Sequence, residues 1–447
     1  MWNYQGRRNY QMKFPTEGFP KRFFKAILCL CGCLLLLLIG IQCFKVDLLT
    51  DYFYRSPTVK GCSGEKGIRA LDVVTKRDLR GLINLETLCN NPDCKIDINY
   101  SGKLFSVETT LDKGFQSYML KAIQHSHSPL IGFVAMDPQT GRILSMIDST
   151  KTKGEKSVCL SSRFPAASIF KIISAAAAID RCNISGDTEL TYNGAAHTLY
   201  KNQLTDRINR YTNSISLKSS FAKSINPVFG KLGISYLKKD LIEEYAIRFG
   251  FNQPIDFELP VEQSRISVSD EPYHWAELAC GFNRATLISP IHAAMIGAAI
   301  VNDGRLVEPT IIELITDDEK NPVYVGGTNV MRQAISPKVS REMKELMAAT
   351  ITRGTCRTTF KRHRRDPVLS KLSIGGKTGS INNKTDELHY DWFVGFCEEK
   401  VGTQKLALAV LVVHDTLLRE KSHKFAHHAM RYYFKESRAW GTVAERG

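Results

Sequence analysis

Hydrophobic and polar positions along the chain become regularly spaced from Leu104 onward. Residues 115–126 have helical spacing, and residues 132–137 form the apolar run of a strand. A Pro-Gln-Thr-Gly sequence at residues 138–141 predicts a turn, and residues 142–147 predict a strand that returns alongside the first. The pattern therefore predicts a helix followed by a β-hairpin.

A second group of elements occupies the rest of the chain. Residues 166–179 predict a helix that is apolar on nearly all sides and therefore buried, and a long, mainly helical stretch continues to Glu308. Three strand-like runs and a closing amphipathic helix follow, at residues 373–378, 391–398, 405–413 and 422–434. This order predicts an α/β (α+β) fold in which an antiparallel sheet is sandwiched with a buried helical cluster.

Residues 26–44 differ in character from the rest of the chain. They carry no charged side chain, and as a helix they would span about 28 Å, enough to cross the hydrocarbon core of a bilayer. Six basic residues and one acidic residue precede them. Because positive flanks stay cytoplasmic, the sequence predicts one transmembrane helix in the inner (cytoplasmic) membrane, with everything after Lys45 on the outer side.

A cleaved signal peptide is the alternative interpretation of this segment. The apolar run is long for a signal peptide, and no small-x-small cleavage site follows it. A Leu-Cys-Gly-Cys sequence at residues 30–33 weakly resembles a lipoprotein processing site, but the apolar run continues past it. We therefore expect an uncleaved anchor.

The sequence predicts five regions in total. They are a basic cytoplasmic tail, the anchor, a membrane-proximal stalk or small subdomain, one large domain and a C-terminal tail, at residues 1–25, 26–44, 45–103, 104–436 and 437–447.

Composition and charge narrow the class of protein. A hydrophobic share of 43% and a charged share of 23% are typical of a folded globular protein. The net charge is +15, and the basic tail contributes six positive and one negative charge, so about +10 belongs to the exported part. Such a surface favours anionic wall polymers or lipid headgroups. Nucleic acid is the other usual partner of a basic chain, and export argues against it.

Eight of the 12 cysteines lie outside the anchor and would face an oxidising compartment after export. Cys89 and Cys94 are separated by an Asn-Asn-Pro-Asp turn, so we expect a local disulfide between them. His423, His427 and His428 lack a partner pair at metal-ligand spacing. We therefore expect these histidines to be surface residues of the terminal helix.

Three short motifs carry the candidate chemistry, and the first runs from Ser168 to Lys171 (Ser-Ile-Phe-Lys). These two residues are three positions apart, so on a helix their side chains share a face. A serine hydroxyl needs a base, and burial would lower the pKa of Lys171 so that it could act as a neutral one. Chance also produces such pairs, and Ser220 and Lys223 form a second copy. That copy ends directly before the next motif. If it were the first motif, no separate second motif would remain, so we interpret it as coincidental.

The second motif is Ser224-Ile225-Asn226, which places a hydroxyl and an amide on one side of a bend. Alone it carries little information, because residues 380–382 match the same Ser-x-Asn pattern. Ser224 could also serve only as a helix cap.

The third motif, Lys377-Thr378-Gly379-Ser380, is the most specific of the three. Its lysine supplies positive charge for a carboxylate, and its hydroxyls add hydrogen-bond donors. Gly379 would let a substrate approach the backbone closely. A glycine-rich hairpin edge is the alternative interpretation of this motif alone.

Together the motifs resemble the signature of penicillin-binding proteins and the related β-lactamases, and the chain is identified as a member of the penicillin-binding transpeptidase family. The resemblance covers roughly residues 104–435, including residues 215–233, 276–309 and 391–396. Ile225 stands where the β-lactamase form of the second motif has Asp. This departs from the β-lactamase pattern but not from the broader family.

The resemblance implies a role for each site residue. Ser168 is expected to be the nucleophile and Lys171 its base, while Ser224 relays a proton to the leaving nitrogen. Asn226 is expected to hold the peptide backbone of the substrate. The backbone N–H groups of Ser168 and Ser380 are expected to form the oxyanion hole. The remaining expected substrate-binding residues are Lys377, Thr378 and Gly379.

The implied activity is that of a membrane-anchored peptidoglycan D,D-transpeptidase that cross-links stem peptides. Ser168 would attack the penultimate D-Ala carbonyl, and β-lactams would acylate the same residue. No metal or organic cofactor is implied. The chain shows no room for a glycosyltransferase domain, so a separate glycosyltransferase partner could dock through the membrane segment.

Two other activities remain open from the sequence. Acyl transfer to water would make the protein a D,D-carboxypeptidase or a serine β-lactamase. The Glu-x-x-Leu-Asn segment of β-lactamases is absent, although a carboxylated Lys171 could activate water instead. A non-catalytic penicillin-binding scaffold or sensor is the third hypothesis, but sensors of this family generally carry a cytoplasmic output domain.

Overall fold

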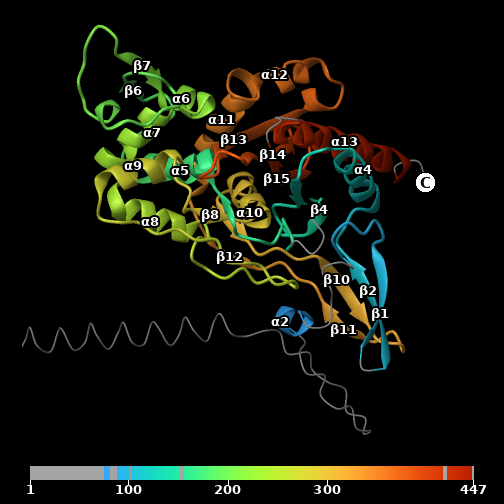
Figure 1. The fold of residues 1–447 in the computed structure, drawn as a ribbon. Coiled ribbons are helices and arrows are strands. Elements are labelled where there is room, and N and C mark those ends of the chain that lie inside the picture. The colour runs from blue at the N-terminus through green and yellow to red at the C-terminus, as the bar shows by residue number, and fades with distance from the viewer. Residues whose placement is uncertain (1–74, 81–87, 101, 152–155, 416–419, 445–447) are drawn as a thin grey trace, which may run out of the picture. The chain divides into compact units, whose positions relative to one another are not determined.

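A five-stranded antiparallel sheet lies at the centre of the computed structural model, which describes residues 75–80, 88–100, 102–151, 156–415 and 420–444 (Figure 1). The strand order is β13-β14-β15-β3-β4, and every neighbouring pair is antiparallel. These strands are Leu372–Asn382, His389–Glu399, Lys405–His414, Leu130–Met136 and Ile143–Thr150. The predicted antiparallel sheet is thus confirmed, with β3 and β4 as its first hairpin.

Side chains of β15 alternate between two hydrophobic cores, one on each face of the sheet. Ala407, Ala409 and Leu411 belong to the larger core, whereas Leu408 and Val410 belong to the other. Helix α10 (Pro290–Val301) packs on the first face, and α4 (Lys113–Gln124) and α13 (Ser422–Ala444) cover the second. Successive side chains of a strand point to opposite faces of the sheet. Because both faces are covered here, the strand sequence is continuously apolar.

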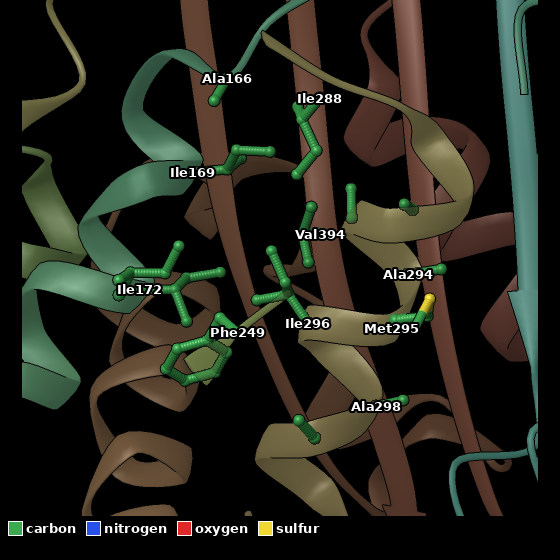
Figure 2. Close-up of a cluster of buried hydrophobic side chains, with 14 of the residues drawn as sticks. Ala166, Ile169, Ile172, Phe249, Ile288, Ala294, Met295, Ile296, Ala298 and Val394 are labelled. Atoms are coloured by element: carbon green, nitrogen blue, oxygen red, sulfur yellow. The ribbon is translucent and has the colours of Figure 1, made fainter. Parts of the chain in front are cut away.

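Helix α10 is buried along its whole length, so it presents apolar side chains in every direction. Figure 2 shows Ile296 of this helix in the same cluster as Val394 of the sheet and Phe249. Ile169 and Ile172, which follow Ser168, join the cluster as well. The segment that carries the first motif is therefore anchored in the main core.

The predicted buried helix at residues 166–179 begins as a 3₁₀ turn, η1 (Ala167–Phe170), and continues as α5 (Lys171–Arg181). The following stretch is mainly helical, as predicted. Its further helices are α6 (Leu217–Lys223), α7 (Asn226–Leu232), the π-helical turn η3 (Gly233–Leu237), α8 (Lys238–Arg248), α9 (Pro272–Cys280) and a short turn η2 (Lys201–Gln203).

Short strands that the sequence pattern did not predict interrupt these helices. They are β5 (Phe164–Pro165), which pairs with β8 (Leu287–Ile288), and β6 (Glu189–Tyr192), which pairs with β7 (Asn213–Ser216). After Glu308 the chain forms α11 (Pro337–Arg353), α12 (Arg357–Phe360), η4 (His363–Arg365) and η5 (Leu369–Lys371).

A second sheet joins segments far apart in sequence, in the order β1-β2-β10-β11. Its strands are Lys95–Tyr100, Lys103–Thr109, Ile312–Thr316 and Pro322–Val325. Strands β9 (Arg305–Val307) and β12 (Val330–Gln333) pair separately, and a short helix α2 spans Lys76–Leu79. Strand β2 begins at Lys103, next to the position at which the sequence predicts the stalk to end, and pairs with β1.

Helix α13 continues to Ala444, past the end of the predicted large domain. The expected disulfide is corrected, because Cys89 and Cys94 are both free. The Cys94 thiol instead donates a hydrogen bond to the Leu111 carbonyl at 3.0 Å, and Cys89 is buried in the core.

The terminal histidines are only partly surface residues. His428 is exposed, but His423 and His427 are half-buried because α13 packs on α12. His423 hydrogen-bonds to Thr359 at 2.8 Å, and the His427 ring lies edge-on to Phe360. In the ranges given above, no helix has the length and apolar character needed to span a bilayer. The expected tail and anchor, residues 1–44, lie outside those ranges.

Candidate active site

Ser168 lies half-buried in η1, one turn before α5 begins at Lys171. The preceding Ala167 has φ 49°, a left-handed conformation that costs a non-glycine residue about 1 kcal/mol. Gly281 (φ 71°) packs directly against this turn, so a β-carbon there would lie 2.9 Å from the Ser168 nitrogen. The backbone around the serine is therefore held in a strained conformation by a close neighbour.

The Lys171 side chain is fully buried and contacts three uncharged oxygens. Its Nζ lies 2.8 Å from Ser168 Oγ, 2.8 Å from Asn226 Oδ1 and 2.5 Å from the Cys280 carbonyl oxygen. Burial lowers the pKa of Lys171 to about 8. The neutral form of this amine is therefore far more accessible near physiological pH than that of an ordinary lysine, and the amine is in direct contact with a hydroxyl.

Ser224 and Asn226 lie on either side of a sharp bend between α6 and α7. Ser224 has φ 57° and ψ 45°, which ends α6 in the left-handed conformation, and Asn226 begins α7. The Asn226 amide nitrogen donates to the His197 carbonyl at 2.9 Å, which leaves the amide oxygen facing Lys171. The bend thus orients the Asn226 amide toward the first motif.

The Lys377 side chain is also fully buried. Its Nζ donates to Ser224 Oγ at 3.0 Å and to the Thr378 carbonyl at 2.7 Å, and it lies 5.6 Å from the centre of the Phe221 ring. Burial, followed by the positive charge of Lys171, lowers the pKa of Lys377 well below its ordinary value. Two buried amines thus occupy one site, each in contact with a serine hydroxyl.

The rest of the third motif lies along β13, at the edge of the main sheet, where the strand faces η1. A β-carbon on Gly379 would be 3.2 Å from the Ile169 nitrogen, so this glycine lets β13 approach the Ser168 turn closely. The Thr378 hydroxyl pairs with Thr355 at 2.6 Å. The exposed Ser380 hydroxyl pairs with His389 at 2.8 Å.

The structure thus brings the three motifs together. Direct hydrogen bonds join Ser168, Lys171 and Asn226, and another joins Ser224 and Lys377. Gly379 connects to this group by packing. The described hydrogen bonds of the Thr378 and Ser380 hydroxyls are made to residues outside the motifs.

The second Ser-x-x-Lys copy does not form such a pair. The Ser220 side chain is fully buried and donates to the Leu217 carbonyl at 2.9 Å. Lys223 is exposed. The interpretation that this copy is coincidental agrees with its geometry.

Several residues around the motifs were not found from the sequence. Cys280 and His197 contribute main-chain carbonyls. Any residue type can supply such a carbonyl, so the sequence does not indicate these two positions. His389 lies opposite Asn382 in the β13–β14 pairing, and Thr355 follows α11. Correct hairpin register would have revealed His389, because Ser380 is two residues from Asn382 on the same strand face.

A serine hydroxyl in contact with a buried amine of lowered pKa can form and release an acyl ester. Strand β13 packs closely on the Ser168 turn at Gly379, so both segments border this serine. The geometry therefore suits acyl transfer.

Comparison with known proteins agrees with this reading of the geometry. The family model described as "Penicillin binding protein transpeptidase domain" matches residues 131–432, which contain all three motifs. The peptidoglycan D,D-transpeptidase PbpA of Mycobacterium tuberculosis is 25% identical over 345 residues, covering 69% of this chain and 67% of that protein.

Solved structures share the fold. Penicillin-binding protein A from M. tuberculosis, solved as an imipenem acyl-enzyme complex, aligns with a TM-score of 0.59 at 22% identity and covers 72% of this chain and 78% of that one. Apo penicillin-binding protein 3 of the same organism aligns with a TM-score of 0.62 at 19% identity, covering 74% and 79%.

Proposed function

The chain belongs to the penicillin-binding protein transpeptidase family, and from this premise we propose that it is a peptidoglycan D,D-transpeptidase that cross-links stem peptides through an acyl-Ser168 intermediate. The observation that carries the proposal is the contact of 2.8 Å between the buried Lys171 amine and Ser168 Oγ. The name of the mycobacterial relative, a peptidoglycan D,D-transpeptidase, supports the same reaction.

In the acylation step, neutral Lys171 takes the proton of Ser168 while Oγ attacks the penultimate D-Ala carbonyl of a stem peptide. The carbonyl oxygen becomes an oxyanion, for which the backbone N–H groups of Ser168 and Ser380 are the proposed donors. The C–N bond to the terminal D-Ala then breaks. Ser224, in contact with Lys377 at 3.0 Å, delivers a proton to the leaving nitrogen and takes in its place the proton that Lys171 removed from Ser168, so that Lys171 is neutral again before the second step.

In the second step, an amine of a neighbouring stem peptide attacks the acyl ester. The new amide forms, Ser168 Oγ leaves, and the proton released by the amine returns to Oγ through Lys171. Before acylation, Asn226 holds the donor peptide backbone, and Lys377 and Thr378, together with Gly379 and Ser380, bind the carboxylate of its terminal D-Ala, which departs in the first step. β-Lactams enter at the same place, because their strained amide presents an equivalent carbonyl to Ser168.

Transfer to an amine rather than to water fits the surroundings of the base. In the part of the chain that the structure describes, Lys171 contacts no carboxylate, and no Asp or Glu contributes to the shift of its pKa. A hydrolase generally needs a group that activates water against the ester. The acyl-enzyme is therefore expected to persist until an amine arrives.

The test supplies purified protein with a stem pentapeptide ending in D-Ala-D-Ala and a labelled amine acceptor. The proposal predicts that the labelled cross-linked product exceeds the hydrolysed tetrapeptide, and that Ser168→Ala loses both. Tetrapeptide alone, at every acceptor concentration, would instead identify a D,D-carboxypeptidase. No product from either route, with binding retained, would identify a non-catalytic scaffold.

The proposal extends to the location of the enzyme. Residues 26–44 are proposed as a single membrane anchor, residues 1–25 as its cytoplasmic tail and the following segment as its membrane-proximal connection. This arrangement would hold the site on the outer side of the inner membrane, where a glycosyltransferase partner could supply nascent strands. Protease treatment of intact and permeabilised cells tests it, because only the tail should be protected in intact spheroplasts.

A further inference from the structure

A strongly basic surface lies beside the candidate site, on elements that contribute no residue to the three motifs. We call this the basic surface, and it consists of seven exposed side chains from the end of α11, from α12, from η4 and the two residues before it, and from the first turn of α13. They are Arg353, Arg357, Lys361, Arg362, Arg364, Arg365 and Lys424.

The charge of the basic surface is not balanced by the protein itself. Residues 353–365 include no Asp or Glu. Within the described ranges, none of the seven side chains forms an ion pair. Elsewhere the pattern is different: Lys218, for example, pairs with both Asp187 and Glu345. Like charges held this close repel one another, so a surface of this kind favours an anionic partner.

The basic surface is continuous with the candidate site. Thr355, two residues before α12 begins, hydrogen-bonds to Thr378 of β13 at 2.6 Å. The Thr355 nitrogen donates to the Ala222 carbonyl, two residues before Ser224. On its other side α12 packs against α13, which in turn packs on β14 and β15 of the main sheet. A polymer bound along this surface would therefore run to the border of the site.

A hollow adjoins the far end of the basic surface. Its volume is about 330 Å³, and Tyr118, Arg431 and Tyr432 are among the residues that line it. The two tyrosine rings stack with centroids 4.0 Å apart. His427 lines the same hollow and contacts Phe360 of α12, which joins the hollow to the charged side chains. Aromatic and basic groups together suit a sugar that carries anionic substituents.

We propose that the basic surface binds the carboxylate-bearing glycan–peptide polymer from which the stem peptides project. This inference rests on the proposed function, since it assigns a second contact to the same substrate. Stem peptides end in carboxylates, so a strand of them is a linear polyanion. Continuity with the site favours this substrate over an anionic membrane, because a polymer that delivers stem peptides to Ser168 must cross the border at Thr355.

The test compares two quadruple variants of the full-length protein. The first, Arg357→Gln/Lys361→Gln/Arg362→Gln/Arg364→Gln, removes four charges from the basic surface. The matched control, Lys103→Gln/Lys121→Gln/Lys320→Gln/Lys338→Gln, removes four exposed charges that do not belong to the basic surface. None of the eight side chains makes a described hydrogen bond or ion pair, so both variants should fold normally.

Binding is measured with purified un-cross-linked glycan–peptide strands, with the same strands after amidation of their carboxylates, and with vesicles of anionic phospholipid. At low ionic strength the surface variant should bind native strands about tenfold more weakly than the wild type and the control. The difference should shrink as salt is added. Amidated strands should bind the wild type and the surface variant equally.

Acylation by penicillin provides the separate readout of the site. It should proceed at the same rate in all three proteins, because penicillin is too small to span the basic surface. Loss of acylation in the wild type would contradict the proposed function, whatever the strands do. Equal binding of native strands by the wild type and the surface variant would overturn the inference. Surface-dependent binding of vesicles but not of strands would overturn it in favour of a membrane contact.

Discussion

Replacing Gly281 by alanine is expected to slow acylation of Ser168 without removing any group of the site. Gly281 follows α9 with φ 71°, and its α-carbon faces the Ala167–Ser168 peptide. An added β-carbon would lie 2.5 Å from the Ala167 carbonyl carbon, closer still to its oxygen, and 2.9 Å from the Ser168 nitrogen. Because side-chain carbons do not approach backbone atoms within 3.0 Å, the turn must move.

The size of this movement determines the expected loss in acylation rate. Moving the added β-carbon and the Ala167 carbonyl carbon to 3.0 Å from each other needs a shift of about 0.5 Å, and the nearer carbonyl oxygen requires a larger one. A misplacement of about 1 Å can cost about 10²-fold in rate, so we expect acylation by penicillin to fall by about 10- to 100-fold. The positive φ adds a loss of about 1 kcal/mol in the free energy of unfolding.

Gly102 offers a matched control. It also has positive φ, at 80°, but an added β-carbon would have no neighbour within 4 Å. Gly102→Ala should therefore lose about as much stability from φ alone and keep the wild-type acylation rate. The assay is stopped-flow acylation with a chromogenic β-lactam, alongside urea unfolding of each variant. Wild-type acylation by a folded Gly281→Ala protein would refute the reasoning, and an equal loss in Gly102→Ala would show that the effect is global.

Three further predictions concern proton transfer, substrate capture and stability. If neutral Lys171 is the base, acylation should rise about tenfold per pH unit below its pKa of about 8 and level off above it, and a rate that is flat from about pH 6 to about 9 would contradict this. His389→Leu removes the partner of the Ser380 hydroxyl and should raise KM for stem peptides about fivefold with kcat retained, since one hydrogen bond contributes about 1 kcal/mol; a change in kcat alone would argue against it. Tyr324→Phe removes one of the donors to the buried Glu258 carboxylate and should lower the free energy of unfolding by about 1.5–3 kcal/mol, and a loss below about 0.5 kcal/mol would contradict the prediction.

The elements that the sequence predicted well are those whose pattern is set by burial. Strand β15 is apolar throughout because both faces of the sheet are covered, and α10, in the stretch predicted to be mainly helical, is buried along its whole length. The Ser168–Lys171 pair was predictable because helical spacing brings these side chains together. Local geometry was sufficient in each case.

Contacts between distant segments could not be predicted in this way. The pairing of β2 with β10 joins residues about 200 positions apart, and the sequence of neither strand indicates which strand it pairs with. Cys280 enters the site through its carbonyl oxygen, which any residue type could supply. The disulfide prediction for Cys89 and Cys94 was wrong because closeness in sequence does not bring two thiols together when one is buried in the core and the other bonds a carbonyl.

Mapping the penicillin adduct is the most direct test of the central claim, that Ser168 is the acylated nucleophile. The wild type, Ser168→Ala and Ser220→Ala are each incubated with penicillin and analysed by intact mass and peptide mapping. Ser220 is the matched control, because it belongs to the second Ser-x-x-Lys copy but is buried and bonded to a main-chain carbonyl. The account predicts one adduct per chain on the peptide that contains Ser168, in the wild type and in Ser220→Ala, and none in Ser168→Ala. An adduct that survives in Ser168→Ala, or that maps to another serine, would contradict it.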